Sequence, residues 1–121
     1  MSILRRAICA AAAPVERLHG EIGFSRQYVF SPENPVFAGH FPGHPILPAV
    51  AQLPMAQTTL EECGMAVALT GVPEAKFLAP LAPSMALRLD LRPGKKDGVW
   101  SCTVYGNGAP AARFSLEVVA P

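Results

Sequence analysis

The stretch GHFPGHPILPAVAQLPMAQ, residues 39–57, decides the fold of this chain. It begins with His40 and His44, four residues apart, and continues through closely spaced prolines. Proline fixes φ and cannot donate a backbone hydrogen bond, so such a segment forms a rigid turn and not a helix. We therefore expect a fixed turn that leads the chain into the N-terminus of a helix at PAV, residues 48–50.

The helix itself is predicted from AVAQLPMAQTTLEECG, residues 49–64. Gly64 is well placed to end it in the left-handed conformation. The positions expected to share its buried face recur at helical spacing and are Val50, Leu53, Gln57 and Leu60.

Pro54 allows two interpretations of this helix. If the helix begins at Ala49, the proline ring clashes with the carbonyl of Val50 and one hydrogen bond is lost, at a cost of about 3 kcal/mol. If it begins near Gln52, Pro54 falls in the first turn and is harmless. The sequence therefore predicts either a kink or a late start.

The rest of the chain predicts strands. Residues 21–30 place apolar side chains on one face, with Arg26 as the exception, and residues 74–81 form a further strand. The segments 85–92, 99–105 and 111–119 alternate cleanly, and the turns PGKKDG and GNG connect them. The expected inward side chains are Ile22, Phe24, Tyr28, Phe30, Met85, Leu87, Leu89, Leu91, Trp100, Cys102, Val104, Ala112, Phe114, Leu116 and Val118. One helix and about five strands predict an α+β fold, an antiparallel sheet wrapped around one central helix in a single domain, residues 1–121.

Composition excludes several classes of function. A net charge of +1 gives no electrostatic reason to expect nucleic acid or a membrane surface as partner, and no apolar run is long enough for a transmembrane helix. The N-terminal MSILRRAICAAAAP resembles a secretory signal, but its apolar run is short and rich in alanine, so we expect a cytoplasmic protein. Cys9, Cys63 and Cys102 lack the spacing of a metal site, and we interpret them as buried free thiols.

The histidines differ in the chemistry that their surroundings allow. His40 and His44 have a spacing that would serve one metal ion on a helix, but the prolines between and after them exclude a helix, and no third ligand is near. We expect no metal. His19 and His44, taken singly, are interpreted as structural or solvated side chains. His40 differs, because it precedes a turn that ends at a helix N-terminus, where free N–H groups can stabilise a developing enolate. A histidine there suits proton abstraction beside a thioester or ketone.

The segment GHFPGHPILPAVAQL resembles the signature of the β-hydroxyacyl-acyl-carrier-protein dehydratases of the hotdog-fold superfamily. The motif H-F-P-G-x-P-x-x-P-G-V is matched by six residues, namely His40, Phe41, Pro42, Gly43, Pro45 and Pro48. The order of the expected strands agrees as well. The residues of the motif are most similar to those of the dehydratase-like subunits of aryl-polyene pathways.

This resemblance implies the hotdog fold and a function: elimination of water from 3-hydroxyacyl thioesters carried on the phosphopantetheine of an acyl carrier protein, in fatty-acid or polyene-type biosynthesis, with no cofactor. It implies that His40 removes the α-proton and that backbone N–H groups of Ala49 and Val50 polarise the thioester carbonyl. A helix carboxylate would protonate the departing hydroxyl, and the acyl chain would lie in an apolar tunnel at a dimer interface. The expected substrate contacts are Phe41, Pro42, Gly43, Leu53, Pro54 and Gln57, and the tunnel is expected near Phe30, Phe37, Leu53 and Phe77.

Two residues depart from the family pattern. Ala49 replaces a glycine, and Pro54 stands where the family has its carboxylate, fourteen positions after the histidine. Glu61 lies two helical turns further on, about 10 Å away. Gln52 and Gln57 can bind a hydroxyl or a water but cannot act as acids.

Several interpretations therefore stay open. The chain is a dehydratase subunit, a catalytically impaired acyl-binding or scaffold partner of one, or, less in keeping with Pro54, an acyl thioesterase. The expected partners are the carrier protein and a second hotdog subunit, in a homodimer or in a heterodimer where that subunit supplies the acid.

Overall fold

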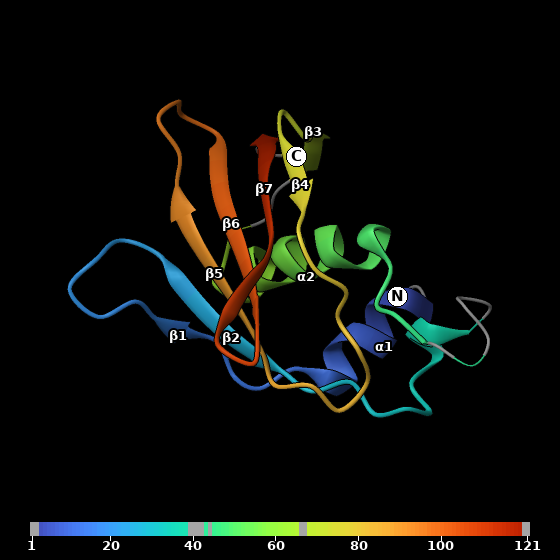
Figure 1. Ribbon diagram of the computed structural model, residues 1–121. Helices are drawn as coiled ribbons and strands as arrows, with labels where there is room; N and C mark the ends of the chain where they lie inside the picture. Colours follow the sequence, from blue (N-terminus) through green and yellow to red (C-terminus); the bar gives the residue numbers. More distant parts are fainter. Residues whose placement is uncertain (1–2, 39–42, 44, 66–67, 120–121) are drawn as a thin grey trace.

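The computed structural model describes residues 3–38, 43, 45–65 and 68–119 (Figure 1). An antiparallel sheet curves beside the helix α2 (Ala49–Glu62). Its strands are β1 (Glu16–Arg17), β2 (Phe24–Tyr28), β3 (Ala68–Gly71), β4 (Ala75–Phe77), β5 (Leu87–Pro93), β6 (Val99–Gly106) and β7 (Ala109–Val119). They follow the order β1-β2-β5-β6-β7-β3, and β4 also pairs with β7. The predicted α+β architecture is confirmed, with two more strands than expected.

The alternation predicted for the second half of the chain is confirmed. The strands β5, β6 and β7 supply a large part of the core. Among the inward positions predicted for them, those exposed by 3% or less are Leu87, Leu89, Leu91, Cys102, Val104, Ala112, Phe114 and Leu116. The turn GNG forms as expected, with positive φ at Asn107 (50°) and Gly108 (87°). Local patterning was sufficient here because each strand pairs with its neighbour in sequence.

The helix α2 begins at Ala49, directly after Pro48, whose extended backbone caps it. The late start near Gln52 is therefore wrong, and Pro54 is the sixth residue of a continuous helix. Gly64, at φ 86°, lies just past its end as predicted.

The predicted buried face of α2 is confirmed only at Leu60, which is fully buried, and is wrong at the other three positions. Val50 is 65% exposed, and Leu53 and Gln57 are half-buried. The buried positions are Ala51, Gln52, Met55, Ala56, Thr58, Thr59 and Leu60. Thr58 and Thr59 can be buried because their hydroxyls donate to the carbonyls of Pro54 and Met55, each at 2.7 Å.

The strand expected over residues 21–30 is shorter than predicted. Ile22 is 80% exposed, because the chain turns at Gly23 and β2 begins only at Phe24. At φ 147°, Gly23 passes so close to the sheet that a Cβ would lie 2.3 Å from the carbonyl oxygen of Leu91. Only glycine fits this approach.

Arg26 is not the exception that its charge suggested, since it faces the same side as its apolar neighbours and is 5% exposed. Its Nε donates to the carbonyl of Ala13 at 2.8 Å, and its guanidinium lies over the ring of Tyr28. Its Nη2 forms an ion pair of 2.7 Å with Glu62 at the end of α2. These contacts pair two of its three nitrogens and so lower the cost of burying this charge, whereas Nη1 is buried with no hydrogen-bond partner among the described residues.

We expect Glu62→Gln to lower the free energy of unfolding by about 1–3 kcal/mol, because it leaves a buried guanidinium without its counter-ion. Urea unfolding at fixed protein concentration measures the change. Glu21→Gln is the matched control, since the pair of Glu21 with Arg92 is exposed on both sides, and a loss of under about 0.5 kcal/mol is expected there. Equal losses in both variants would contradict the assigned role of Arg26.

The helix α1 (Ile3–Ala11) was not predicted. Ala7 and Ile8 are buried within the common core, Arg5 pairs with Glu61 of α2, and the Asn34 amide donates to the Ala7 carbonyl at 2.9 Å. In the sequence, this alanine-rich segment resembled a secretory signal. That resemblance gives no information about which of its side chains pack against the core.

The cysteines are free thiols, as expected. Cys102 is buried, and burial raises the pKa of its thiol far above the ordinary value. Cys9 and Cys63 are only half-buried, which corrects the expectation of three buried thiols. Within the described residues, no helix combines the length and the apolar character that a membrane crossing needs.

Candidate functional site

The N-terminus of α2 opens onto a groove of about 310 Å³. The residues that line it come from the segment before α2, from its first turn and from the chain that follows β4, and are Ile46, Leu47, Pro48, Ala49, Gln52, Phe77, Leu78, Ala79 and Pro80. The Leu47 N–H donates to the Leu81 carbonyl at 2.7 Å and fixes the two walls together. The groove is therefore built around the first turn of the helix.

The first amides of α2 are available at this groove. Ala49 and Val50 are exposed, and Pro48 offers no side-chain cap. The Ala51 N–H donates to the Pro48 carbonyl at 3.0 Å, whereas the N–H groups of Ala49 and Val50 have no recorded acceptor among the described residues. Unpaired amides at a helix N-terminus carry partial positive charge and can bind a carbonyl oxygen or an oxyanion. The methyl group of Ala49 adds no backbone strain, because a helical residue has negative φ.

The predicted site residues fall into three groups. His40, Phe41, Pro42 and His44 lie outside the described residues. Gly43 is exposed at φ 86°, a conformation that favours glycine. Leu53, Pro54 and Gln57 are half-buried on α2, and none of them lines the groove.

The expected tunnel residues also divide. Phe30 and Phe37 are buried in the core, with rings 6.2 Å apart, whereas Phe77 lines the groove and is 44% exposed.

No carboxylate lines the groove as the structure describes it. Both acidic residues of α2 are committed to ion pairs near its other end: Glu61 with Arg5, and Glu62 with Arg26. The residue at the family's acid position, Pro54, has no group that can transfer a proton. The described walls of the groove can therefore hold a carbonyl but cannot protonate a leaving group.

Gln52 is the one polar side chain among the described residues that line the groove. It is 4% exposed, and its Oε1 has no hydrogen-bond partner among the described residues. From the sequence, Gln52 was expected to be able to bind a hydroxyl or a water but not to act as an acid. Its spacing of three residues from Ala49, which places both on one side of a helix, was the available signal.

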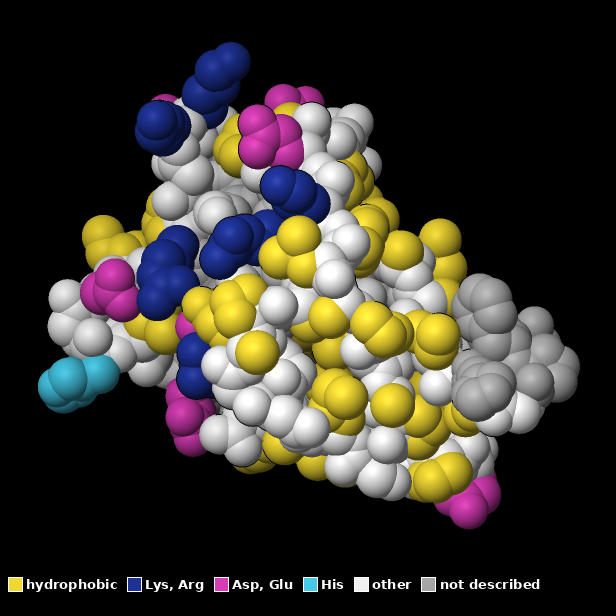
Figure 2. Space-filling model, viewed as in Figure 1, with side chains coloured by type: hydrophobic (Ala, Val, Ile, Leu, Met, Phe, Trp, Pro, Cys, Tyr) yellow, Lys and Arg dark blue, Asp and Glu magenta, His cyan; other side chains and the backbone are white. Residues whose placement is uncertain are grey.

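Large apolar side chains surround the groove and are exposed. Val50 is 65%, Leu78 47% and Phe77 44% exposed. β4, which carries Phe77, pairs with β7 alone and leaves its other edge open in the described chain. Figure 2 shows hydrophobic side chains gathered around the position of β4 and of the chain that follows it. Such a patch beside an open strand edge is typical of a surface that another protein covers.

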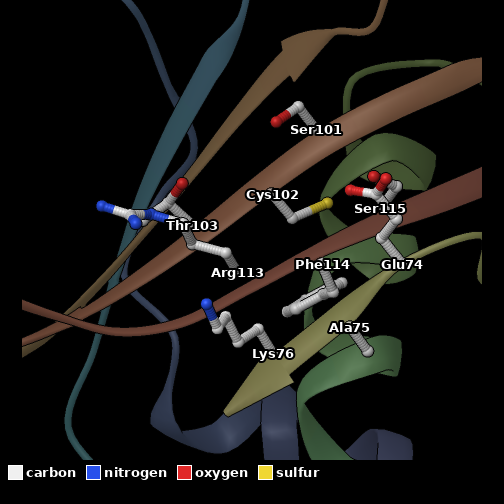
Figure 3. A pocket seen from close by; sticks show the side chains of 9 residues that line it. All are labelled: Glu74, Ala75, Lys76, Ser101, Cys102, Thr103, Arg113, Phe114 and Ser115. Atoms are coloured by element: carbon white, nitrogen blue, oxygen red, sulfur yellow. The ribbon is translucent and has the colours of Figure 1, made fainter. Parts of the chain in front are cut away.

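A second cavity, of about 470 Å³, lies on the outer face of the sheet across β4, β7 and β6. Lys76 of β4 lies opposite Arg113 of β7, and Arg113 lies opposite Thr103 of β6. Figure 3 shows the Lys76 and Arg113 side chains at the same end of this cavity, with Glu74 and Ser115 at the other. Neither cation has an ion-pair partner within the described residues. Two positive charges on directly opposite residues of neighbouring strands repel each other and lower the stability of the fold. An acidic ligand bound at Lys76 and Arg113 would relieve this repulsion.

Known proteins share both the sequence and the fold that build this groove. Residues 19–113 match the model of a family described as ApeI-like, ApeI dehydratase. A 3-hydroxyacyl-[acyl-carrier-protein] dehydratase, FabZ, of Erythrobacter litoralis is 37% identical over 121 residues, covering 88% of this chain and 76% of the relative. The FabZ of Acidiphilium cryptum is 39% identical over 75 residues, which cover 53% of this chain and only 46% of that relative.

A similar fold occurs in a solved structure, the dehydratase heterocomplex ApeI:P from Xenorhabdus doucetiae. Its superposition has a TM-score of 0.77 at 21% identity and covers 88% of this chain and 95% of that one. The arrangement of antiparallel sheet and central helix is therefore the hotdog fold.

Proposed function

Because the chain belongs to the ApeI-like dehydratase family, we propose that it is a dehydratase subunit that removes water from 3-hydroxyacyl thioesters on an acyl carrier protein. The observation that carries this proposal is the first turn of α2, which begins with the amides of the exposed residues Ala49 and Val50 and follows the HFPG segment in the sequence. Ala49 lines an apolar groove. These amides would bind the thioester carbonyl and stabilise the enolate that forms when His40 removes the α-proton.

The departing hydroxyl needs a proton that the described part of this chain does not offer at the groove. We propose that a second hotdog subunit covers Val50, Phe77 and Leu78 and supplies the acid. The exposed apolar surface and the free edge of β4 support such a contact. The similar protein from Xenorhabdus doucetiae is a heterocomplex, which favours a non-identical partner.

Pro54 also favours a second candidate function, in which the chain binds the acyl group but performs no chemistry. One assay distinguishes the two. A 3-hydroxyacyl carrier protein is incubated with the chain alone, with the partner subunit alone and with both, and loss of water is followed by mass. Activity that appears only in the mixture supports the proposal that this chain is a dehydratase subunit. Full activity of the partner alone, unchanged by addition of this chain, would favour the acyl-binding role.

We further propose that the carrier protein docks on the cavity at Lys76 and Arg113. Lys76 adjoins Phe77 in β4, so a carrier bound on the outer face sits beside the wall of the groove. Lys76→Glu combined with Arg113→Glu is expected to weaken carrier binding at least about tenfold, because like charges would then oppose an acidic surface. Isothermal titration at low and at moderate salt measures this, and added salt should weaken wild-type binding.

Lys95→Glu is the control for this docking surface, because Lys95 is exposed in the turn after β5. This substitution changes the net charge by the same amount as either single substitution at the docking surface. Comparable weakening by Lys95→Glu would mean that only overall charge matters. In that case the docking position at Lys76 and Arg113 would be wrong.

A further inference from the structure

Gln52 combines nearly complete burial with a missing hydrogen bond. The residue is 4% exposed, and its Oε1 is buried with no hydrogen-bond partner in the described part of the chain. Buried polar atoms in folded proteins are almost always paired, because an unpaired acceptor loses its water without compensation. A side chain of similar length without the amide, such as methionine, would avoid this loss. The presence of glutamine and not of an apolar residue at this position therefore indicates a role in function and not in stability.

The place of Gln52 indicates what that use is. It lines the groove at the first turn of α2, three residues after Ala49. The backbone amide of Ala49 and the unpaired Oε1 of Gln52 are independent features of one cavity, whose other described lining side chains are apolar. Together they make a site with donors for one oxygen and an acceptor for a second group.

We infer that Gln52 recognises the 3-hydroxyl group of the acyl substrate, with its side-chain carbonyl accepting a hydrogen bond from that hydroxyl. This inference rests on the proposed function. When the first-turn amides hold the thioester carbonyl, the hydroxyl-bearing carbon is two carbons further along the acyl chain. The hydroxyl then lies close to the carbonyl oxygen, because only the α-carbon separates the carbon atoms that carry the two groups. Rotation about the terminal torsion of Gln52, which has a broad and roughly two-fold preference, turns Oε1 toward the groove.

Recognition of a hydroxyl by an acceptor has a consequence for the reaction. The enoyl product has lost the hydroxyl, so it leaves Oε1 unpaired once more. Gln52 therefore favours binding of the substrate over binding of the product and over saturated acyl groups. In this role it is a binding and specificity residue, and the proton for the leaving group still comes from elsewhere.

The test uses the 3-hydroxyhexanoyl and hexanoyl amides of pantetheine, in which nitrogen replaces the thioester sulfur so that no reaction occurs. Their affinities are measured for the chain in the assembly in which it purifies. We expect the hydroxylated amide to bind about three- to tenfold more tightly, as one additional hydrogen bond provides. Gln52→Met is expected to abolish this ratio and to raise the melting temperature of the ligand-free protein, since it removes an unpaired buried acceptor. Gln27→Met, on the exposed face of β2, should change neither.

The outcomes separate this inference from the proposed function. Equal binding of both amides to the wild-type protein would overturn the role of Gln52 and leave the proposed acyl site standing. Failure of both amides to bind would count against the acyl site itself and therefore against both. If Gln52→Met lowered the melting temperature and weakened both amides alike, Gln52 would be a structural residue and the inference would be wrong.

Discussion

Replacing Pro54 with glutamate is expected to give this chain dehydratase activity without a partner of different sequence. The substitution returns a carboxylate to the position at which the resembled dehydratases carry their acid. In an assembly of identical copies, each active site would then hold the His40 of one copy and the introduced carboxylate of another. A general acid contributes about 10²–10⁴-fold to such a reaction, so the gain over the unsubstituted chain is expected in that range. Loss of water from a 3-hydroxyacyl carrier protein, followed by mass, measures it.

The same substitution is expected to stabilise the chain. Pro54 occupies the sixth position of α2, where it cannot donate to the Val50 carbonyl, and an interior proline costs about 3 kcal/mol. We therefore expect a gain of up to about 3 kcal/mol in the free energy of unfolding. Pro54→Ala is the matched control, because it should bring the stability without the activity. If Pro54→Glu remained as inactive as Pro54→Ala, a missing acid would not explain the behaviour of this chain.

The strands β5, β6 and β7 were predictable because their information is local. Each has strict alternation, and each pairs with a strand adjacent in sequence through a turn that contains residues at positive φ, such as Gly98 and Gly108. A short run of sequence therefore fixes both the fold and the side that faces α2.

The buried face of α2 could not be predicted in the same way. Counting apolar residues favours Val50 and Leu53, but the sheet packs against small and hydroxylated residues such as Ala51 and Thr59. The hydroxyl of Thr59 is satisfied within the helix, so it behaves as a small apolar residue there. The larger apolar residue Val50 is left on the outside, where the proposed partner would cover it.

The candidate site was predictable in its backbone and not in its side chains. A proline-set turn before a helix indicated free amides at Ala49 and Val50, which is a consequence of helix geometry alone. The burial of Gln52 depends on the chain after β4, whose Leu78 and Pro80 lie some thirty residues away in sequence. Arg26 is similar, since its position in the core depends on Glu62 at the far end of α2. Contacts of this kind are set by the tertiary fold.

Replacing His40 with alanine is expected to lower the dehydration rate of the active assembly by at least about 10²–10⁴-fold, the contribution of a well-placed general base. Only neutral imidazole can accept the α-proton. The wild-type kcat/KM should therefore fall as the solution is made acidic, since a protonated imidazole cannot accept the α-proton. His40→Ala should remove this acid limb along with the rate, because the titrating group is gone.

Two histidines of the same chain provide controls for this result. His44 occupies the variable position of the same sequence motif, and His19 lies in an exposed loop before β2, so alanine at either position should change the rate by less than about threefold. The assay must contain both subunits, because a chain without its acid partner is expected to be slow whatever stands at position 40. If the assembly kept full activity with His40→Ala, the base would have to come from the partner subunit. The HFPG turn of this chain would then serve only to deliver the backbone into α2 and to present the amides of Ala49 and Val50 to the thioester.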